Sequence, residues 1–212
     1  MNIGEAMRIV LSGPGNIEYH FKELLQISKE DLDRHILNIT RVLLNDELVL
    51  LPDKGISLEI AKKYKELTGK RVIATLPKED YEIGIDHLKT NLNLDIWDET
   101  INTKTWYKHD LMHNLFGDVI LYLGNSLGSI GELAYGFYLY KLLGKNTIKL
   151  NSEIKAGQSI PFIVLVYKPF VKEKLSFELE EYIKKAQGQI FYIENANELK
   201  DKLNDLKTKL KI

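Results

Sequence analysis

Residues 118–132 read Asp-Val-Ile-Leu-Tyr-Leu-Gly-Asn-Ser-Leu-Gly-Ser-Ile-Gly-Glu. The apolar, partly β-branched run predicts a buried strand, and the small residues after it lead into a helix whose first turn carries Glu132. At the carboxyl edge of a parallel sheet, free backbone N–H groups and the helix dipole together favour an anion such as phosphate. The segment therefore predicts an α/β fold and a phosphorylated ligand.

Apolar strands alternate with helical segments along the rest of the chain. We expect strands at 8–11, 47–51, 71–76, 118–123, 147–150, 161–166 and 189–193, and helices at 28–45, 57–68, 103–117, 130–143, 176–187 and 196–211. Strands that are apolar throughout indicate a parallel sheet covered on both faces. The expected fold is a single Rossmann-like domain over 1–212, a doubly wound, mostly parallel α/β sheet with helices on both faces. Residues 78–102 are polar and only weakly periodic, and a loop of this length inside a compact domain is usually either functional or a wrong assignment.

Composition excludes several classes of function. Apolar residues make up 44% of the 212 positions, and 29 basic against 30 acidic side chains leave a net charge of −1. No overall field therefore attracts nucleic acid or acidic lipid. The chain has no cysteine, no signal-peptide pattern at its start and no apolar run long enough to span a bilayer. We expect a cytoplasmic protein that binds neither nucleic acid nor a membrane.

Three turns of small residues follow expected strands, at 12–16, 52–57 and 124–129. Glycine permits tight turns and close backbone approach to a ligand. Lys54, beside a helix start, either meets a phosphate or, as is more common, is simply solvated. The candidate ligand-binding residues from these turns are Gly13, Gly15, Gly55, Gly124, Asn125, Ser126, Gly128 and Ser129.

Glu132 has two interpretations of similar weight. It can pair with Ser129 in an S-x-x-E capping box, in which each side chain binds the other's backbone N–H. It can instead face a ligand. Gly131 favours the second interpretation slightly, because glycine inside a helix costs roughly 1 kcal/mol relative to alanine.

The order of these motifs resembles the Rossmann-like LOG family of nucleoside-monophosphate phosphoribohydrolases, part of the wider SLOG superfamily, with this chain as a divergent member. The family pattern P-G-G-x-G-T-x-x-E follows a strand that begins with aspartate. The matching segments are Asp118-Val119-Ile120-Leu121, Gly128-Ser129-Ile130-Gly131-Glu132, Gly144-Lys145, Val72-Ile73-Ala74-Thr75-Leu76-Pro77 and Ile190-Phe191-Tyr192-Ile193. Departures are Gly124-Asn125-Ser126 in place of P-G-G, and no clean match to the family's arginine.

The resemblance implies hydrolysis of an N-glycosidic bond in a nucleoside 5′-monophosphate. Glu132 would stabilise the oxocarbenium ion or orient water, and Lys108 or His109 would have to replace the arginine. His109 and His113 are spaced i, i+4, and the simpler interpretation is an ordinary pair of surface histidines on one helix. Two ligands alone do not complete a metal site. We therefore expect no metal and no resident cofactor.

Other functions remain open. One is a non-catalytic sensor or carrier of a nucleotide or nucleotide-bearing cofactor, which the missing arginine favours. Another is a nucleoside deoxyribosyltransferase, because Gly128-Ser129, Glu132 and Tyr135-Gly136-Phe137 also resemble that family's turn and helix. A third is an assembly protein without a ligand. The expected partners are a small phosphorylated molecule and, by family resemblance, a second copy of the chain in a homodimer.

Overall fold

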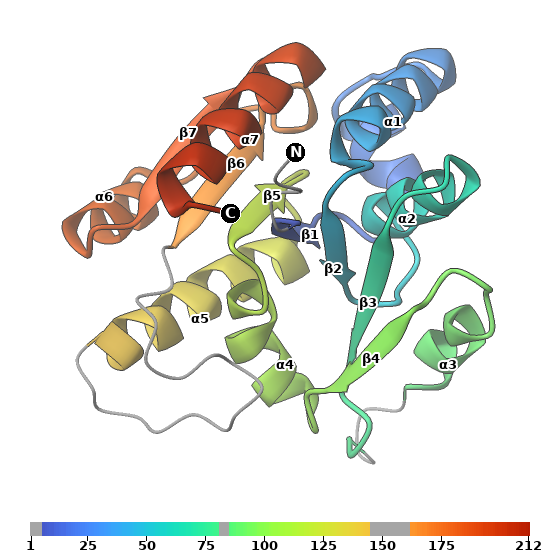
Figure 1. The fold of residues 1–212 in the computed structure, drawn as a ribbon, viewed down its shortest axis with the longest axis horizontal. Helices are drawn as coiled ribbons and strands as arrows, with labels where there is room; N and C mark the ends of the chain where they lie inside the picture. Colours follow the sequence, from blue (N-terminus) through green and yellow to red (C-terminus); the bar gives the residue numbers. More distant parts are fainter. Residues whose placement is uncertain (1–5, 81–84, 145–161) are drawn as a thin grey trace.

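A computed structural model describes residues 6–80, 85–144 and 162–212. All the strands lie in one parallel sheet, in the order β4-β3-β2-β1-β5-β6-β7 (Figure 1). This confirms the expected Rossmann-like, doubly wound α/β class. The strands are β1 (Arg8–Ser12), β2 (Glu47–Leu50), β3 (Arg71–Leu76), β4 (Glu99–Asn102), β5 (Val119–Tyr122), β6 (Ile163–Tyr167) and β7 (Gln189–Ile193).

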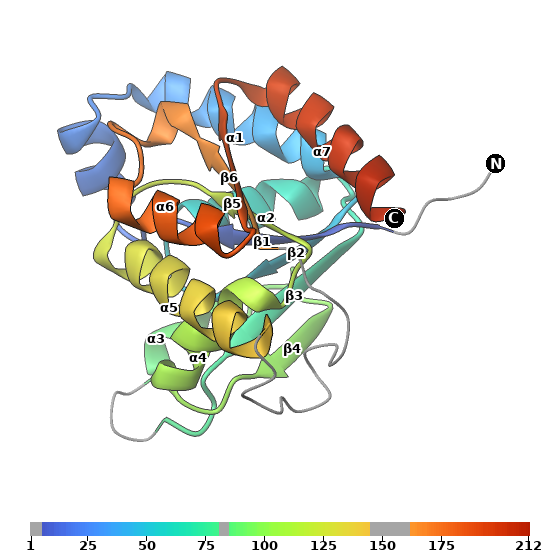
Figure 2. The same cartoon turned by 90° about the vertical axis from the view of Figure 1, so that its left-hand side faces the viewer.

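Helices cover the sheet on both faces. They are α1 (Lys29–Leu43), α2 (Ile56–Glu66), α3 (Asp86–Leu92), α4 (Trp106–Met112), α5 (Leu127–Gly144), α6 (Phe177–Lys185) and α7 (Ala196–Leu210). Three shorter turns join them: the π-helical η1 (Glu18–Leu24) and the 3₁₀-helical η2 (His113–Leu115) and η3 (Lys168–Phe170). Figure 2 shows α1, α2 and α7 on one face and α4, α5 and α6 on the other.

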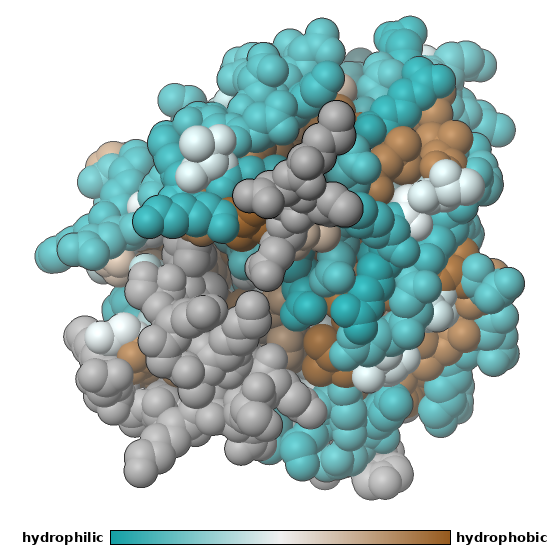
Figure 3. Space-filling view, in the orientation of Figure 1, coloured by the Kyte–Doolittle hydropathy of each residue, from teal (hydrophilic) through white to brown (hydrophobic). Residues whose placement is uncertain are grey.

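Two apolar cores follow from this layering, because successive side chains of a strand point to opposite faces. In β1, Ile9 and Leu11 join the core beneath α1, α2 and α7, whereas Val10 joins the core with α5 and α6. All three side chains are buried. The outer surface over α1 and α7 is mostly hydrophilic (Figure 3), as expected for helices that bury one stripe.

The chain changes direction at β1. It builds β2, β3 and β4 outward on one side, then crosses back to place β5 on the other side of β1. In open parallel sheets, the loops on either side of such a strand diverge and leave a crevice at the carboxyl edge. This topology places the candidate site beyond the ends of β1 and β5.

The prediction of a long loop at 78–102 is wrong. The segment contains α3 and the edge strand β4, which pairs with β3 in the register Ile73↔Glu99 to Leu76↔Asn102. The strand has no apolar alternation because all its residues are only half-buried. It is stabilised instead by polar contacts, with Asp98 accepting from the Val72 N–H at 2.7 Å and Glu99 paired with Arg71.

Helix boundaries also differ from those expected. The helix predicted at 103–117 is α4 followed by η2, and it begins after Thr105, whose hydroxyl accepts from the Lys108 N–H. The η1 turn was not expected, because a π-helix breaks the 3.6-residue periodicity used for prediction. The strand predicted at 147–150 lies outside the described residues. No helix in the described ranges is long and apolar enough to cross a membrane.

Candidate functional site

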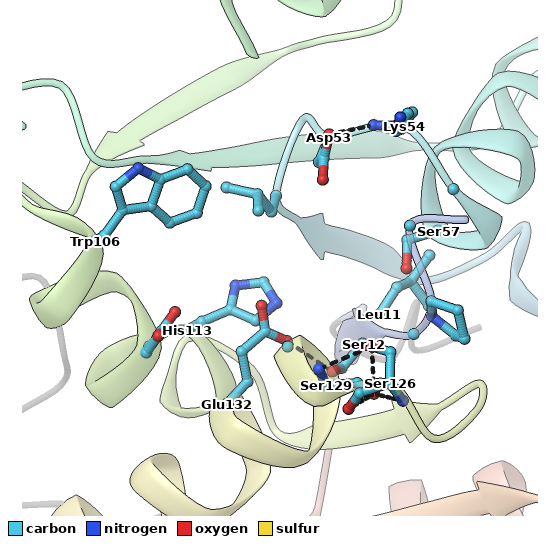
Figure 4. A pocket seen from close by; sticks show the side chains of 17 residues that line it. Leu11, Ser12, Asp53, Lys54, Ser57, Trp106, His113, Ser126, Ser129 and Glu132 are labelled. Carbon is cyan, nitrogen blue, oxygen red and sulfur yellow. Dashed lines mark hydrogen bonds between the residues drawn. The ribbon is translucent and has the colours of Figure 1, made fainter. Parts of the chain in front are cut away.

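A cavity of about 350 Å³ lies at the crevice between the loops that follow β1, β2 and β5 (Figure 4). This volume is within the usual range for small-molecule sites. Helix α4 closes the remaining side. The lining residues are Leu11, Ser12, Gly13, Pro14, Gly15, Leu51, Asp53, Lys54, Gly55, Ser57, Trp106, Asp110, His113, Ser126, Gly128, Ser129 and Glu132.

The loops after β1 and β2 are interlocked at Gly55. This residue has φ +131°, and a Cβ there would lie 2.4 Å from the Pro14 carbonyl oxygen and 2.6 Å from the Gly15 Cα. The Ile56 N–H, at the start of α2, donates to the same Pro14 carbonyl at 3.2 Å. Gly13 is equally crowded, since a Cβ would lie 2.7 Å from the Ile56 Cγ2. Packing alone therefore requires glycine at both positions.

Gly124 and Asn125 shape the turn after β5 but do not line the cavity. Gly124 has φ +139°, and a Cβ would lie 2.7 Å from the His20 Nε2. The Asn125 Oδ1 accepts a hydrogen bond from the Tyr122 hydroxyl at 3.0 Å. Asn125 therefore does not fill the crevice, and the cavity beside Ser126 and Gly128 stays open.

Helix α5 begins with a reciprocal cap between Ser126 and Ser129. The Ser129 N–H donates to the Ser126 Oγ at 3.1 Å, and the Ser126 N–H donates to the Ser129 Oγ at 2.8 Å. Of the two interpretations of Glu132, the capping box with Ser129 is therefore wrong. It is displaced by one turn, because the helix begins at Leu127 rather than at Ile130.

Gly128 lies in the first turn of α5 and lines the cavity. A Cβ at this position would meet only the Ser126 Oγ, at 3.9 Å, and a Cβ at Gly131 would meet nothing within 4 Å. Packing therefore does not explain either glycine. Gly128 therefore brings the start of a helix, where backbone N–H groups and the helix dipole favour an anion, to the cavity with no side chain in between.

Because Ser126 and Ser129 form the cap, Glu132 is not needed there, and its side chain points toward the cavity (Figure 4). Its Oε2 accepts a hydrogen bond from the Ser12 Oγ at 2.7 Å. Burial raises the pKa of Glu132, although His109 and the Ser12 hydroxyl act in the opposite direction. The carboxyl is therefore held where a bound ligand would meet it, in a setting that favours its neutral form.

His109 and His113 are not the surface pair that their spacing suggested, since both side chains are 0% exposed. Their rings stack with centroids 4.8 Å apart. The Thr75 Oγ1, at the end of β3, lies 3.1 Å from the His109 Nε2 and 3.0 Å from the His113 Nδ1. The packing of α4 and η2 against the end of β3 therefore forms a buried polar network behind the cavity.

The other predicted catalytic candidate, Lys108, is exposed and does not line the cavity. His109 lies behind the cavity wall, within the cluster that includes Asp110 and Glu132. Lys54 does line the cavity, and it is the one Lys or Arg among the lining residues, all of which belong to the described ranges.

Prediction from sequence missed Asp53, Ser57, Trp106, Asp110 and His113 as lining residues. Asp53 and Ser57 belong to a turn that was identified, so their position gave a usable signal. Trp106 and Asp110 come from α4 and His113 from the adjoining η2, and the place of α4 over the cavity depends on the unexpected strand β4. Trp106 stacks on His87, with ring centroids 6.3 Å apart, and its Nε1 has no hydrogen-bond partner among the described residues.

The buried histidines should make the protein sensitive to acid. Burial lowers the pKa of His113 to about 4 from its ordinary value of 6.5, and burial also lowers that of His109. The unfolded chain therefore binds protons first as the pH falls through 6.5, which favours unfolding. From His113 alone we expect a loss of about 2 kcal/mol of unfolding free energy between pH 7.5 and pH 5.

Urea unfolding at the two pH values measures this loss. His113→Gln should show a smaller acid-induced loss than the natural protein, whatever its stability at pH 7.5. His87→Gln is the matched control, because the His87 side chain is 54% exposed. An acid-induced loss of the same size in His113→Gln as in the natural protein would contradict the prediction.

No protein-family model and no curated protein matches the sequence. Solved structures do share the fold. The chain is similar to the Moco carrier protein from Chlamydomonas reinhardtii, with TM-score 0.60 and 17% identity over 97% of this chain and 99% of that chain. It is also similar to the molybdenum cofactor binding protein from the phototrophic bacterium Rippkaea orientalis, with TM-score 0.55 and 16% identity over 95% and 98%.

At these identities the comparison establishes the fold. The chain has a Rossmann-like α/β fold, and this fold matches these structures over nearly their full length.

Proposed function

We propose that the protein is a binding or carrier module for a small organic molecule bearing a phosphate group, such as a nucleotide or a nucleotide-like cofactor. The observation that carries this proposal is Gly128, an uncrowded glycine that faces the cavity from the first turn of α5. The start of α2 lies on the same cavity through Gly55 and Ser57. Two helix N-termini together favour a phosphate more than either would alone.

The lining favours binding over catalysis. A phosphoribohydrolase of the resembled family uses an arginine, a permanent cation that can bind phosphate through two hydrogen bonds. Here the cavity holds Lys54 alone, and Lys108 is exposed elsewhere on α4. Two of the structurally similar proteins are named as a carrier protein and a binding protein of the molybdenum cofactor. The same class of ligand, an organic cofactor bound intact, is our first choice for this chain.

The second candidate is hydrolysis of an N-glycosidic bond, which the position of Glu132 favours. The carboxyl lies in the cavity and is fixed by the Ser12 hydroxyl at 2.7 Å. A carboxyl in this place can stabilise positive charge on a sugar or hold a water molecule. A deoxyribosyltransferase needs a nucleophile as well, and Glu132 would have to serve alone.

Binding of a matched pair of ligands tests the first choice. AMP and adenosine differ only in the phosphate, so thermal shift and calorimetry with both isolate its contribution. We expect AMP to raise the melting temperature, because selective binding to the folded state stabilises it. Adenosine should bind at least tenfold more weakly. AMP should be recovered intact after prolonged incubation with the protein.

The alternatives give distinct results. Release of adenine or ribose 5-phosphate, abolished in Glu132→Ala, would replace the carrier proposal with the hydrolase. Base exchange without hydrolysis would indicate the transferase. Equal affinity for AMP and adenosine, or no shift with AMP, other nucleoside monophosphates or inorganic phosphate, would overturn the phosphate site itself.

We also propose that the protein is a cytoplasmic homodimer that uses the outer face of α5. Tyr135 and Tyr138 are each 52% exposed on this helix, and Leu127 is 93% exposed. Exposed apolar side chains gathered on one element often mark a protein interface. Light scattering should give twice the chain mass, and Tyr135→Glu with Tyr138→Glu should return the protein to a monomer.

A further inference from the structure

Three potential metal ligands meet at the floor of the cavity: His109, Asp110 and Glu132. One ligand atom from each lies within 4.8 Å of the other two. The His109 Nδ1 lies 3.4 Å from the Asp110 Oδ1, too long for a good hydrogen bond. Donor atoms bound to one transition-metal ion lie about 2.0–2.3 Å from it, and hence about 3–4 Å from one another. The separations within the cluster, at most 4.8 Å, approach this spacing.

The hydrogen bonds of Thr75 explain why the cluster needs a positive charge. Its hydroxyl has a single proton, so it donates to one histidine and accepts from the other. If Thr75 donates to the His113 Nδ1, it accepts from the His109 Nε2–H. The His109 Nδ1 then carries a lone pair, directed toward Asp110 and close to Glu132. In that tautomer the lone pair of the His109 Nδ1 faces the Asp110 carboxylate at 3.4 Å, and a cation between them removes the repulsion.

This arrangement is also the one in which metal-binding histidines are usually held. Such a histidine donates its other ring N–H to a fixed acceptor, which sets its tautomer and orientation. For His109 the acceptor is the Thr75 Oγ1, at 3.1 Å from Nε2, and both side chains are 0% exposed. The ligand is therefore pre-oriented by the fold before any ion binds.

The environment of His113 agrees with the same tautomer. Its side chain is 0% exposed and lines the same cavity, yet its Nε2 makes no hydrogen bond of acceptable geometry. The backbone carbonyl of Leu11 lies beside the His113 ring. When Thr75 donates to the His113 Nδ1, the proton of His113 lies on Nε2, where this carbonyl is available. The tautomer that suits a metal at His109 therefore also suits His113.

The charges of the cavity agree with a cation. Asp53, Asp110 and Glu132 line it against Lys54 alone. We propose that His109, Asp110 and Glu132 form a binding site for one divalent transition-metal ion, open to the cavity on its remaining coordination positions. Imidazole nitrogen with two carboxylates suits ions from Mn²⁺ to Zn²⁺ better than Mg²⁺ or Ca²⁺. The expectation of no metal considered only the two histidines, and the fold supplies the missing carboxylates.

Titration of chelator-treated, tag-free protein with Co²⁺ and Zn²⁺, without nucleotide, tests the site. We expect one ion per chain, a visible Co²⁺ absorption spectrum that Zn²⁺ displaces, and at least tenfold weaker binding of Mg²⁺. Asp110→Asn and Glu132→Gln should each weaken Co²⁺ binding at least tenfold. Asp86→Asn is the matched control and should bind as the natural protein does, since the Asp86 side chain is 90% exposed and does not line the cavity.

Several outcomes would overturn the site: no stoichiometric binding, equal affinity for Mg²⁺, or unchanged affinity in Asp110→Asn. The Asp110 side chain is 39% exposed, so its amide variant is expected to fold, and circular dichroism checks this. The AMP titration, repeated with a chelator present, tests the phosphate site separately. Failure of one site is therefore distinguishable from failure of the other.

Discussion

Replacing Gly55 with alanine is expected to destabilise the protein by about 3–5 kcal/mol. At φ +131° and ψ −169°, Gly55 occupies a backbone region that residues with a Cβ scarcely adopt. The added Cβ would also lie 2.4 Å from the Pro14 carbonyl oxygen, which is backbone and cannot rotate away. The backbone strain at Gly55 and the overlap of the new Cβ with Pro14 add, because neither is relieved without separating the loops after β1 and β2.

Urea unfolding at neutral pH measures this loss. Gly131→Ala is the matched control, since its Cβ meets nothing within 4 Å, and it should gain up to about 1 kcal/mol from helix propensity. If Gly55→Ala does not fold, Gly15→Ala gives a graded test, because its Cβ would lie 3.2 Å from the Lys54 carbonyl oxygen. A loss below about 1 kcal/mol in Gly55→Ala would contradict the interlocked turn.

Replacing Gly128 with aspartate is expected to weaken AMP binding at least about 100-fold, or ~2.7 kcal/mol, while leaving the fold as stable or more stable. The new carboxylate would lie in the first turn of α5, where it interacts favourably with the helix dipole. It would occupy the place proposed for phosphate and repel it. Binding and stability should therefore change in opposite directions, which a damaged fold would not produce.

Calorimetry with AMP and thermal melting without ligand measure the two effects. Gly131→Asp carries the same charge on the same helix but away from the cavity lining, and should bind AMP within a few-fold of the natural protein. Gly128→Ala should fall between the two. Unchanged AMP affinity in Gly128→Asp would place the phosphate elsewhere in the cavity.

Strands with apolar side chains on both faces were predictable because burial on two sides leaves a continuous apolar run, as in β1 and β5. β4 was not, because an edge strand with half-buried residues has no such run. Because β4 was missed, the position of α4 over the cavity was also missed. Without β4, the sequence gives no reason to place His109 and His113 under the cavity rather than at the surface.

The candidate site was predictable to a similar degree. Turns after apolar strands meet at one sheet edge, so Gly13, Gly55 and Gly128 could be brought together from sequence order alone. What the sequence could not separate is the reason for each glycine. Gly55 and Gly124 are required by the backbone conformation, since their φ values are +131° and +139°. Gly128 has no such φ, and a Cβ there would not be crowded. Only the three-dimensional neighbours of each position make this distinction.

The interlocking of the loops at Gly55 divides the cavity into two parts with different freedom to evolve. The wall built by the loops after β1 and β2 behaves as one unit, so a change in either loop disturbs both. Helix α4 contributes Trp106 and Asp110 from outside that unit, and the adjoining η2 contributes His113. Selectivity for the organic part of a ligand can therefore be changed on α4, by substituting residues such as Trp106, without disturbing the wall that the two interlocked loops build.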